Sequence, residues 1–416
     1  MGPGSGWDGP GPGRTRSTLR AARQHTAQEK PVAGVATLAG MTDRLLVDFF
    51  YAQQLGHAIE ALQYCVGHAA AVPGREVSVL LNAATPTELA TWCPAVSAVF
   101  PVDAPLLEPD PAARERLAGV PRDWDWVVDD TRRHQSFQLD LFPGMRHHYA
   151  ASDVHLRASR GRSVVGAERV GYLPQQPVRL DLPAAARAAV TRRLGAGERP
   201  RIAVLPAGSS DPALYPSVAS WRLVLDALTD AVPGLQLVLL GRLARDERSS
   251  TSWRRDDVDG LLASRAAPVD CVDVPLAEQL AVVEACDVLL APHSGFGMAA
   301  LAVGTPWLAL SGGRWFEYWS NSVPFRSVLP DTRRYPAFSQ FDPVDVVADG
   351  DDGPRTPSMT RARVREDLDR LVAGARELLA GELTHEAALR DYYRDLHAAI
   401  GGEAIWSIDG VHAAYL

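Results

Sequence analysis

The segment Ala291–Met298 holds the residue types that most directly suggest chemistry. It reads Ala-Pro-His-Ser-Gly-Phe-Gly-Met and follows a predicted strand, Asp287–Leu290. A Ser-Gly turn that opens a helix gathers free backbone N–H groups and the positive end of a helix dipole at one point, which attracts phosphate. We therefore expect a phosphorylated ligand at Ser294 and Gly295. The alternative is an ordinary strand-helix unit whose glycines serve only close packing.

The first half of the chain is predicted to alternate between strands and helices. Its expected strands are Leu45–Tyr51, Val77–Leu81, Ala98–Val102 and Trp124–Val128. Its expected helices are 56–71, 85–93 and 135–150, the last with a break at Pro143. This alternation implies a parallel sheet that helices cover on both faces.

The second half repeats the alternation after an Ala/Arg-rich connector at 183–200. Its expected strands are 201–206, 235–240, 269–274, 287–290 and one that follows Gly304 and ends near Leu310. Its expected helices are 218–231, 276–286 and the one that Gly304 ends. We expect a disordered or loosely docked tail at 1–43, two domains at 44–182 and 201–348, and a helical tail at 349–416. Part of the helical tail is expected to pack toward the first domain.

The composition fits a two-domain protein of this kind. The chain has 416 residues, of which 46% are hydrophobic, and this length exceeds what one hydrophobic core usually serves. The net charge of −8 and the lack of a basic block argue against a nucleic-acid partner. The only lysine is Lys30, which excludes a Walker A loop. Arginine, histidine and backbone N–H groups must therefore meet any phosphate charge.

The four cysteines show no C-x-x-C spacing, which predicts buried thiols in a reducing compartment rather than disulfides or a zinc site. They are Cys65, Cys93, Cys271 and Cys286. No apolar run approaches the ~20 residues that cross a bilayer, and the chain does not begin with a hydrophobic signal region. We therefore expect a cytoplasmic protein without a membrane span.

Three segments resemble the heptosyltransferase-like glycosyltransferase family 9. The family's strand, Leu-Gly-Asp and helix pattern falls on Leu45–Tyr51 and Leu55–His57. Its Ala-Thr-Thr loop is similar to Ala207–Asp211, which Pro216 and Trp221 follow. Its Asp-Thr-Gly-x-x-His motif falls on His293–Met298, and the spacing agrees across most of residues 44–345.

The resemblance implies the α/β GT-B architecture, in which two Rossmann-like domains with parallel sheets face each other across a cleft. It assigns 44–182 to the acceptor side and 201–348 to binding a nucleotide sugar. The implied reaction moves a sugar from a nucleotide-diphosphate donor to an acceptor hydroxyl, with no metal or other cofactor. The acceptor class expected is a small molecule or an envelope precursor.

His57 stands where the family has its catalytic Asp. We interpret His57 as the general base that takes the acceptor proton, because an imidazole titrates near physiological pH. Glu60, three residues on and on the same helical face, is expected to orient His57 or stabilise its charged form. The alternative is that His57 only begins a helix and that Glu60 is a solvated partner.

Donor-side residues are expected to meet the charge of the leaving diphosphate. They are Ser209, Ser210, Arg242, His293, Ser294 and Gly295, with Glu247 on the ribose hydroxyls. His293 replaces a family Asp and offers a cation or a hydrogen bond. A bulky residue at Gly295 is expected to remove nucleotide binding and leave the fold intact. Arg242 as a surface arginine and Glu247 as part of a solvated loop are the alternatives.

Three further motifs lie outside the donor set. Asp130, Arg132 and His134 follow a buried strand and are expected on the acceptor side. The aromatic segment 311–319 is expected to help close the cleft by stacking, or else to form a packing cluster. Asp123-Trp124-Asp125 has the form of a metal motif but leads into a buried strand, so we interpret it as structural.

Rival functions differ in what they do with the nucleotide sugar. A sugar-nucleotide epimerase of the same architecture would keep the phosphate turn and act on the sugar itself. A non-catalytic protein that binds a sugar nucleotide or a partner would explain why family residues are replaced. A dinucleotide oxidoreductase is weakly supported, because the turn after Tyr51 lacks G-x-G-x-x-G.

Overall fold

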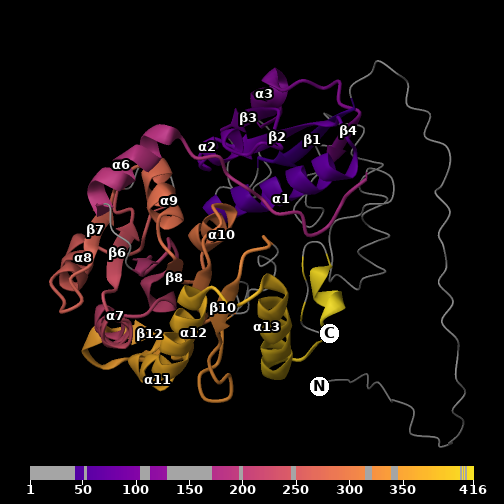
Figure 1. Cartoon of the computed structure of the whole chain (residues 1–416). Helices are drawn as coiled ribbons and strands as arrows, with labels where there is room; N and C mark the ends of the chain where they lie inside the picture. The colour runs from indigo at the N-terminus through magenta and orange to yellow at the C-terminus, as the bar shows by residue number, and fades with distance from the viewer. Residues whose placement is uncertain are drawn as a thin grey trace, which may run out of the picture. The chain divides into compact units, whose positions relative to one another are not determined.

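The computed structural model describes residues 43–50, 54–103, 113–128, 171–195, 200–244, 250–313, 321–338, 345–402, 405, 407 and 410–416 (Figure 1). The predicted tail, 1–43, lies outside these residues except for Asp43. The helix predicted at 135–150 also lies outside them.

Four parallel strands form the first sheet, in the order β3-β2-β1-β4. The strands are β1 (Arg44–Phe49), β2 (Glu76–Asn82), β3 (Ala98–Val102) and β4 (Trp126–Val128), and the helical elements among them are α1 (Leu55–Ala71), α2 (Glu88–Thr91), α3 (Ala113–Arg116) and η1 (Leu117–Gly119). In β1, Val47 pairs with Val79 on one side and Val128 on the other. This inner strand is fully buried from Leu45 to Phe49, as its apolar sequence predicts.

Six parallel strands form the second sheet, in the order β10-β9-β8-β5-β6-β7. The strands are β5 (Arg201–Val204), β6 (Gln236–Gly241), β7 (Val269–Val272), β8 (Val288–Pro292), β9 (Trp307–Leu310) and β10 (Phe325–Val328). The helical elements that precede or connect them are α6 (Ala184–Leu194), η2 (Pro212–Leu214), α7 (Val218–Ala231), α8 (Arg255–Leu262), α9 (Leu276–Glu284) and α10 (Gly295–Ala302). The two parallel sheets confirm the predicted α/β class.

One helix and one strand in the second half of the chain, α8 and β10, were not predicted from the sequence. The α8 segment is short and rich in acidic residues, and β10 (Phe-Arg-Ser-Val) has only four residues, of which two are apolar and two are polar. Too few apolar positions recur in either segment to reveal a helical or strand period. The helix predicted at 85–93 is also shorter than expected, since α2 spans only Glu88–Thr91.

The C-terminal segment packs mainly on the second sheet. Its elements are β11 (Val347–Ala348), η3 (Gly350–Asp352), β12 (Pro354–Arg355), η4 (Pro357–Met359), α11 (Arg361–Glu366), α12 (Leu368–Ala380), α13 (His385–Ile400) and η6 (Val411–Ala414). The main contacts of α12 are with α7, β9 and β10, and α13 packs against β10. The expectation that this tail packs toward the first domain is therefore wrong for its main contacts. The short strand β10, with its buried Phe325 and Val328, offers the tail a partner that the sequence did not reveal.

None of the helices among the described residues is long and apolar enough to cross a membrane. The four cysteines are buried and unpaired, as the lack of paired spacing predicted.

Candidate functional site

The Ser-Gly turn opens a helix at the carboxyl end of β8, as predicted. Ser294 is the N-cap of α10, and its Oγ accepts a hydrogen bond of 3.3 Å from the N–H of Gly297. Gly297 lies against Trp307 of β9, where an added Cβ would come within 2.3 Å of the indole. A serine cap and a glycine that admits the tryptophan together fix the first turn of this helix. Gly304, with φ of +86°, follows its end.

Helix α1 begins against the same turn. Gly56 and Gly295 are in direct contact, since a Cβ on Gly295 would lie 2.3 Å from the Gly56 nitrogen and 2.7 Å from its Cα. Helices α1 and α10 contact each other at these first turns. The first turns of two helices, each following an inner strand of its own sheet, therefore meet where neither has a side chain.

This contact corrects the expectation for Gly295. A side chain there would collide with the backbone of Gly56, which cannot move aside as the tip of a flexible side chain can. A bulky substitution must therefore separate α1 from α10. A loss of nucleotide binding in such a variant would therefore also reflect the disturbed fold.

His57 follows Gly56 directly, so the contact places it beside the α10 turn. Its ring is half-buried, and its backbone N–H donates to the carbonyl of Gln54 at 3.0 Å. Glu60 is 1% exposed, which excludes its interpretation as a solvated partner. A buried carboxylate needs a polar or charged neighbour, and its spacing from His57 places both on one side of α1.

The loop after β5 reaches the same turn from another side. A Cβ on Gly208 would lie 3.7 Å from the Cβ of Ser294, so the two loops are neighbours. Ser209 and Ser210 are exposed there. The N–H of Ser210 donates to the hydroxyl of Tyr215 at 3.2 Å, and burial raises the pKa of this phenol.

Arg242 lies in the adjacent loop, after β6. Its carbonyl accepts a hydrogen bond of 2.7 Å from the N–H of Thr251, and the next residue, Ser252, donates from its N–H to the Gly208 carbonyl at 2.7 Å. Oδ1 of Asp273 accepts from the N–H groups of the two residues after Arg242, at 2.6 and 3.2 Å. The half-buried Arg242 is thus anchored beside the serine loop and is not an isolated surface arginine.

His293 differs from the cation that the sequence suggested. Its ring stacks on Trp307, with centroids 5.8 Å apart. Desolvation lowers the pKa of His293 from 6.5 to about 3, so the ring is neutral at physiological pH. Of the two roles expected, only the hydrogen bond fits this environment.

Several sequence-predicted residues lie outside the described residues. They are Glu247 on the donor side, Asp130, Arg132 and His134 on the acceptor side, and the aromatic residues of 314–319. In the suspected metal motif, Asp123 forms an ion pair of 2.6 Å with Arg44, and Asp125 accepts from the Arg44 N–H at 2.8 Å. Both carboxylates therefore serve the start of β1, in agreement with the structural interpretation.

Four residues near the site were missed by the sequence analysis. They are Asp48, Tyr215, Asp273 and Arg363. Of these four, only Asp48 could have been identified from the sequence, because it is an acidic residue within an otherwise apolar strand. A buried carboxylate must be paired or hydrogen-bonded, and Asp48 is fully buried. Asp273 and Arg363 bond to backbone groups 29 or more residues away, and Tyr215 bonds to the nearby Ser210 N–H, and no local sequence pattern predicts these contacts.

No protein-family model and no curated protein sequence matches this chain. Among solved structures, a glycosyl transferase family 9 protein from Veillonella parvula superposes with a TM-score of 0.54 at 13% identity, over 82% of this chain and 98% of that one. The ADP-heptose LPS heptosyltransferase II of E. coli gives a TM-score of 0.47 at 17% identity, over 79% and 98% of the two chains. A putative UDP-N-acetylglucosamine 2-epimerase from Listeria monocytogenes gives 0.39 at 11% identity, over 86% and 97%. The first of these shows that the chain has the GT-B fold of a family 9 glycosyltransferase.

Proposed function

We propose that this protein is a glycosyltransferase that moves a sugar from a nucleotide-diphosphate donor to an acceptor hydroxyl. One observation carries the proposal: the Gly56–Gly295 contact brings His57 next to the capped first turn of α10. A base for the acceptor and a set of backbone donors for the leaving group are the two parts that this reaction needs.

The donor diphosphate is assigned to the loops of the second sheet. Ser294 and Gly295 open a helix, and Ser209 and Ser210 are exposed on the neighbouring loop. N–H groups and a helix dipole there favour an anion, and Arg242 adds the positive charge. Both loops follow the carboxyl ends of parallel strands, where open α/β sheets collect their ligands. Because His57 and His293 replace Asp residues of the resembling family, we do not assign heptose as the donor sugar.

The base is assigned to His57. In this scheme its imidazole takes the proton of the acceptor hydroxyl as that oxygen attacks the anomeric carbon, while the bond to the diphosphate breaks. The buried Glu60 would stabilise the imidazolium so formed. Neutral His293 would donate or accept a hydrogen bond at the diphosphate. We expect the reaction to need no metal and to take place in the cytoplasm, where the four buried thiols stay reduced.

The test is turnover of the full chain with ADP-, UDP-, GDP- and dTDP-sugars, each with and without candidate acceptor alcohols. Release of the nucleoside diphosphate with a glycosylated or hydrolysed product, unchanged by EDTA, supports the proposal. An epimerised sugar with no released diphosphate would assign the epimerase reaction instead. Binding without any product would identify a non-catalytic sugar-nucleotide protein. The matched control is His57→Ala, which should bind donor and fail to turn it over.

A further inference from the structure

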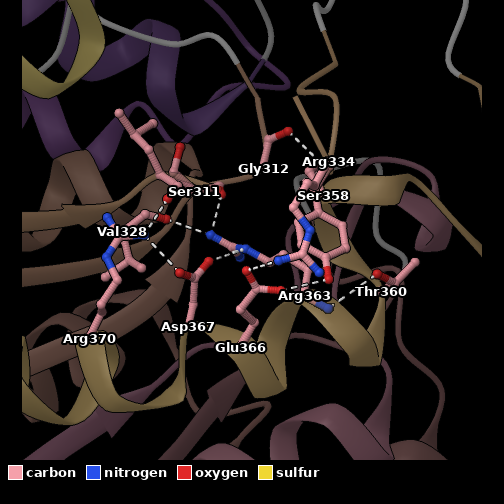
Figure 2. Close-up of polar contacts among 12 residues, drawn as sticks. Ser311, Gly312, Val328, Arg334, Ser358, Thr360, Arg363, Glu366, Asp367 and Arg370 are labelled. Atoms are coloured by element: carbon pink, nitrogen blue, oxygen red, sulfur yellow. Dashed lines mark hydrogen bonds and ion pairs between the residues drawn. The ribbon is translucent and has the colours of Figure 1, made fainter. Parts of the chain in front are cut away.

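A fully buried arginine in α11 holds the ends of two strands of the second sheet. Arg363 is 0% exposed, and its Nη2 donates to the carbonyls of Ser311 at 3.0 Å and Val328 at 2.6 Å (Figure 2). Its Nε pairs with Asp367 at 2.8 Å. Ser311 directly follows β9 and Val328 ends β10, so Arg363 joins their carboxyl ends.

These ends lie at the same edge of the sheet as the candidate site. Leu310 of β9 pairs in register with Pro292 of β8, so Ser311 lies one strand over from His293. Ser358 donates from its Oγ to the Gly312 carbonyl at 2.6 Å. Two successive carbonyls of the Ser311–Gly313 loop are thus held by side chains of the C-terminal segment.

Holding these carbonyls also sets the direction of the next N–H groups. In a trans peptide the C=O and the following N–H point in opposite directions. With the Ser311 and Gly312 carbonyls turned toward Arg363 and Ser358, the N–H groups of Gly312 and Gly313 point away from them. Among the described residues, neither N–H has a hydrogen-bond acceptor. Successive N–H groups that face away from Arg363 and Ser358 and have no partner within the described part of the chain suit an anion or a hydroxyl.

Burial makes the positive charge of Arg363 energetically unfavourable. Desolvation lowers the pKa of Arg363 to about 10, which still leaves the guanidinium protonated at physiological pH. Its counter-ion is shared, because Asp367 also binds Arg370 at 2.7 Å. A buried ion pair of this kind adds little to the free energy of folding. We therefore interpret Arg363 as a residue that selects one conformation of the backbone that it contacts.

We propose that Arg363 is a positioning residue of the donor site, which fixes the Ser311–Gly313 loop so that its N–H groups meet the donor. This role rests on the proposed function. The competing role is a structural staple between β9 and β10, with no effect on ligand.

The experiment compares three variants of the full chain. Arg363→Lys keeps the charge and loses the planar fork. Ser358→Ala removes the second hold on the same loop. Arg370→Gln is the matched control, since Arg370 shares Asp367 but donates to Leu329 rather than to the loop. Each is measured, without ligand, for amide hydrogen exchange of the peptide covering 311–313, in which the Ser311 N–H donates to the Val328 carbonyl at 3.2 Å and is the reporting amide. Each is also measured for thermal stability and for titration with ADP, UDP and GDP.

We expect Arg363→Lys to speed exchange at 311–313 and weaken binding of the nucleoside diphosphate by about tenfold each, the equivalent of roughly one lost hydrogen bond. Ser358→Ala should change both in the same direction by about threefold. Arg370→Gln should leave both within about twofold, even where it lowers thermal stability as much as Arg363→Lys.

Lowered stability with unchanged exchange and affinity in Arg363→Lys overturns the positioning role. If that variant does not fold, Ser358→Ala decides in the same way. A wild-type protein that binds none of the nucleotides overturns the proposed function. In that case amide exchange at 311–313 in the ligand-free variants still tests whether Arg363 and Ser358 fix the loop. Faster exchange in the variants supports this contact, and unchanged exchange overturns it.

Discussion

Helices α1 and α10 both begin after an inner parallel strand and meet at their first turns, but they begin in different ways. At α10, Ser294 caps the helix with its own side chain. At α1, the N-cap is Gln54, whose side chain makes no capping hydrogen bond, and no acidic residue lies in the first turn. The α10 turn is therefore organised by its own sequence, whereas the start of α1 depends on its contact with α10.

This difference suggests a division of roles. A turn that is already capped and packed on Trp307 needs no reorganisation to receive an anion. At the start of α1, Gly56 contacts the α10 turn, so the position of the adjacent reactive side chain, His57, depends in part on this contact. The predictions below test each side of this comparison, in order of decreasing effect.

The largest effect is expected from His57→Ala. A positioned general base contributes ~10²- to 10⁴-fold, so kcat should fall by that factor. Donor affinity should change little, because the donor loops belong to the second sheet. The measurement is steady-state turnover together with donor titration. His57→Asp, which restores the residue of the resembling family, should keep part of the activity, and full turnover by His57→Ala would remove His57 from the mechanism.

The next largest effect concerns the contact itself. Gly295→Ala places a Cβ 2.3 Å from the backbone of Gly56, whereas Gly56→Ala meets the Gly295 Cα at 3.1 Å and the flexible Met298 sulfur at 3.3 Å. Overpacking of this kind costs roughly 1–3 kcal/mol, so Gly295→Ala should lower the free energy of unfolding toward the upper end and Gly56→Ala toward the lower end.

Denaturant unfolding measures the two effects. Gly119→Ala is the control, because nothing lies within 4 Å of its added Cβ. Equal decreases in the free energy of unfolding for Gly295→Ala and Gly56→Ala would mean that the two backbones lie farther apart than in the structure.

A third effect should appear as acid sensitivity on the α10 side. Because the pKa of His293 falls from 6.5 unfolded to about 3 folded, the unfolded chain takes up a proton first as the pH drops. Stability from this group is complete above pH 6.5 and is lost as the pH falls toward 3. Since each pKa unit is worth ~1.4 kcal/mol and His293 as a whole residue keeps some exposure to water, we expect a loss of roughly 2 kcal/mol.

The measurement is the free energy of unfolding against pH for the wild type and His293→Asn. The difference between the two curves should open below pH 6.5. Parallel curves across this range would show that the folded ring titrates normally.

The smallest effects are expected from the caps. Ser294→Ala should cost ~1 kcal/mol and weaken nucleotide binding, because it frees the first turn of α10. Gln54→Ser, which gives α1 the cap that it lacks, should raise the free energy of unfolding by ~0.5–1 kcal/mol. Thermal unfolding of both variants measures the change. A gain from Ser294→Ala, or a loss from Gln54→Ser, would contradict the comparison.

Sequence patterns alone predicted the strand-helix alternation, the parallel sheets and the Ser294 turn. These features depend on apolar periodicity, glycine and serine chemistry, and short connections, which are all local properties of the chain. For the same reason the buried strand around Val47 and the helix 218–231 were placed correctly.

The contacts between these elements became visible only in the folded structure. The contact of Gly56 with Gly295, the burial of Glu60, the neutral state of His293 and the hold of Arg363 on Ser311 each join residues far apart in the sequence. The sequence around a glycine does not predict which backbone segment will contact it. The sequence around a histidine or an arginine does not predict how far its side chain will be desolvated. Those quantities are set by packing between distant elements, which local patterns do not encode.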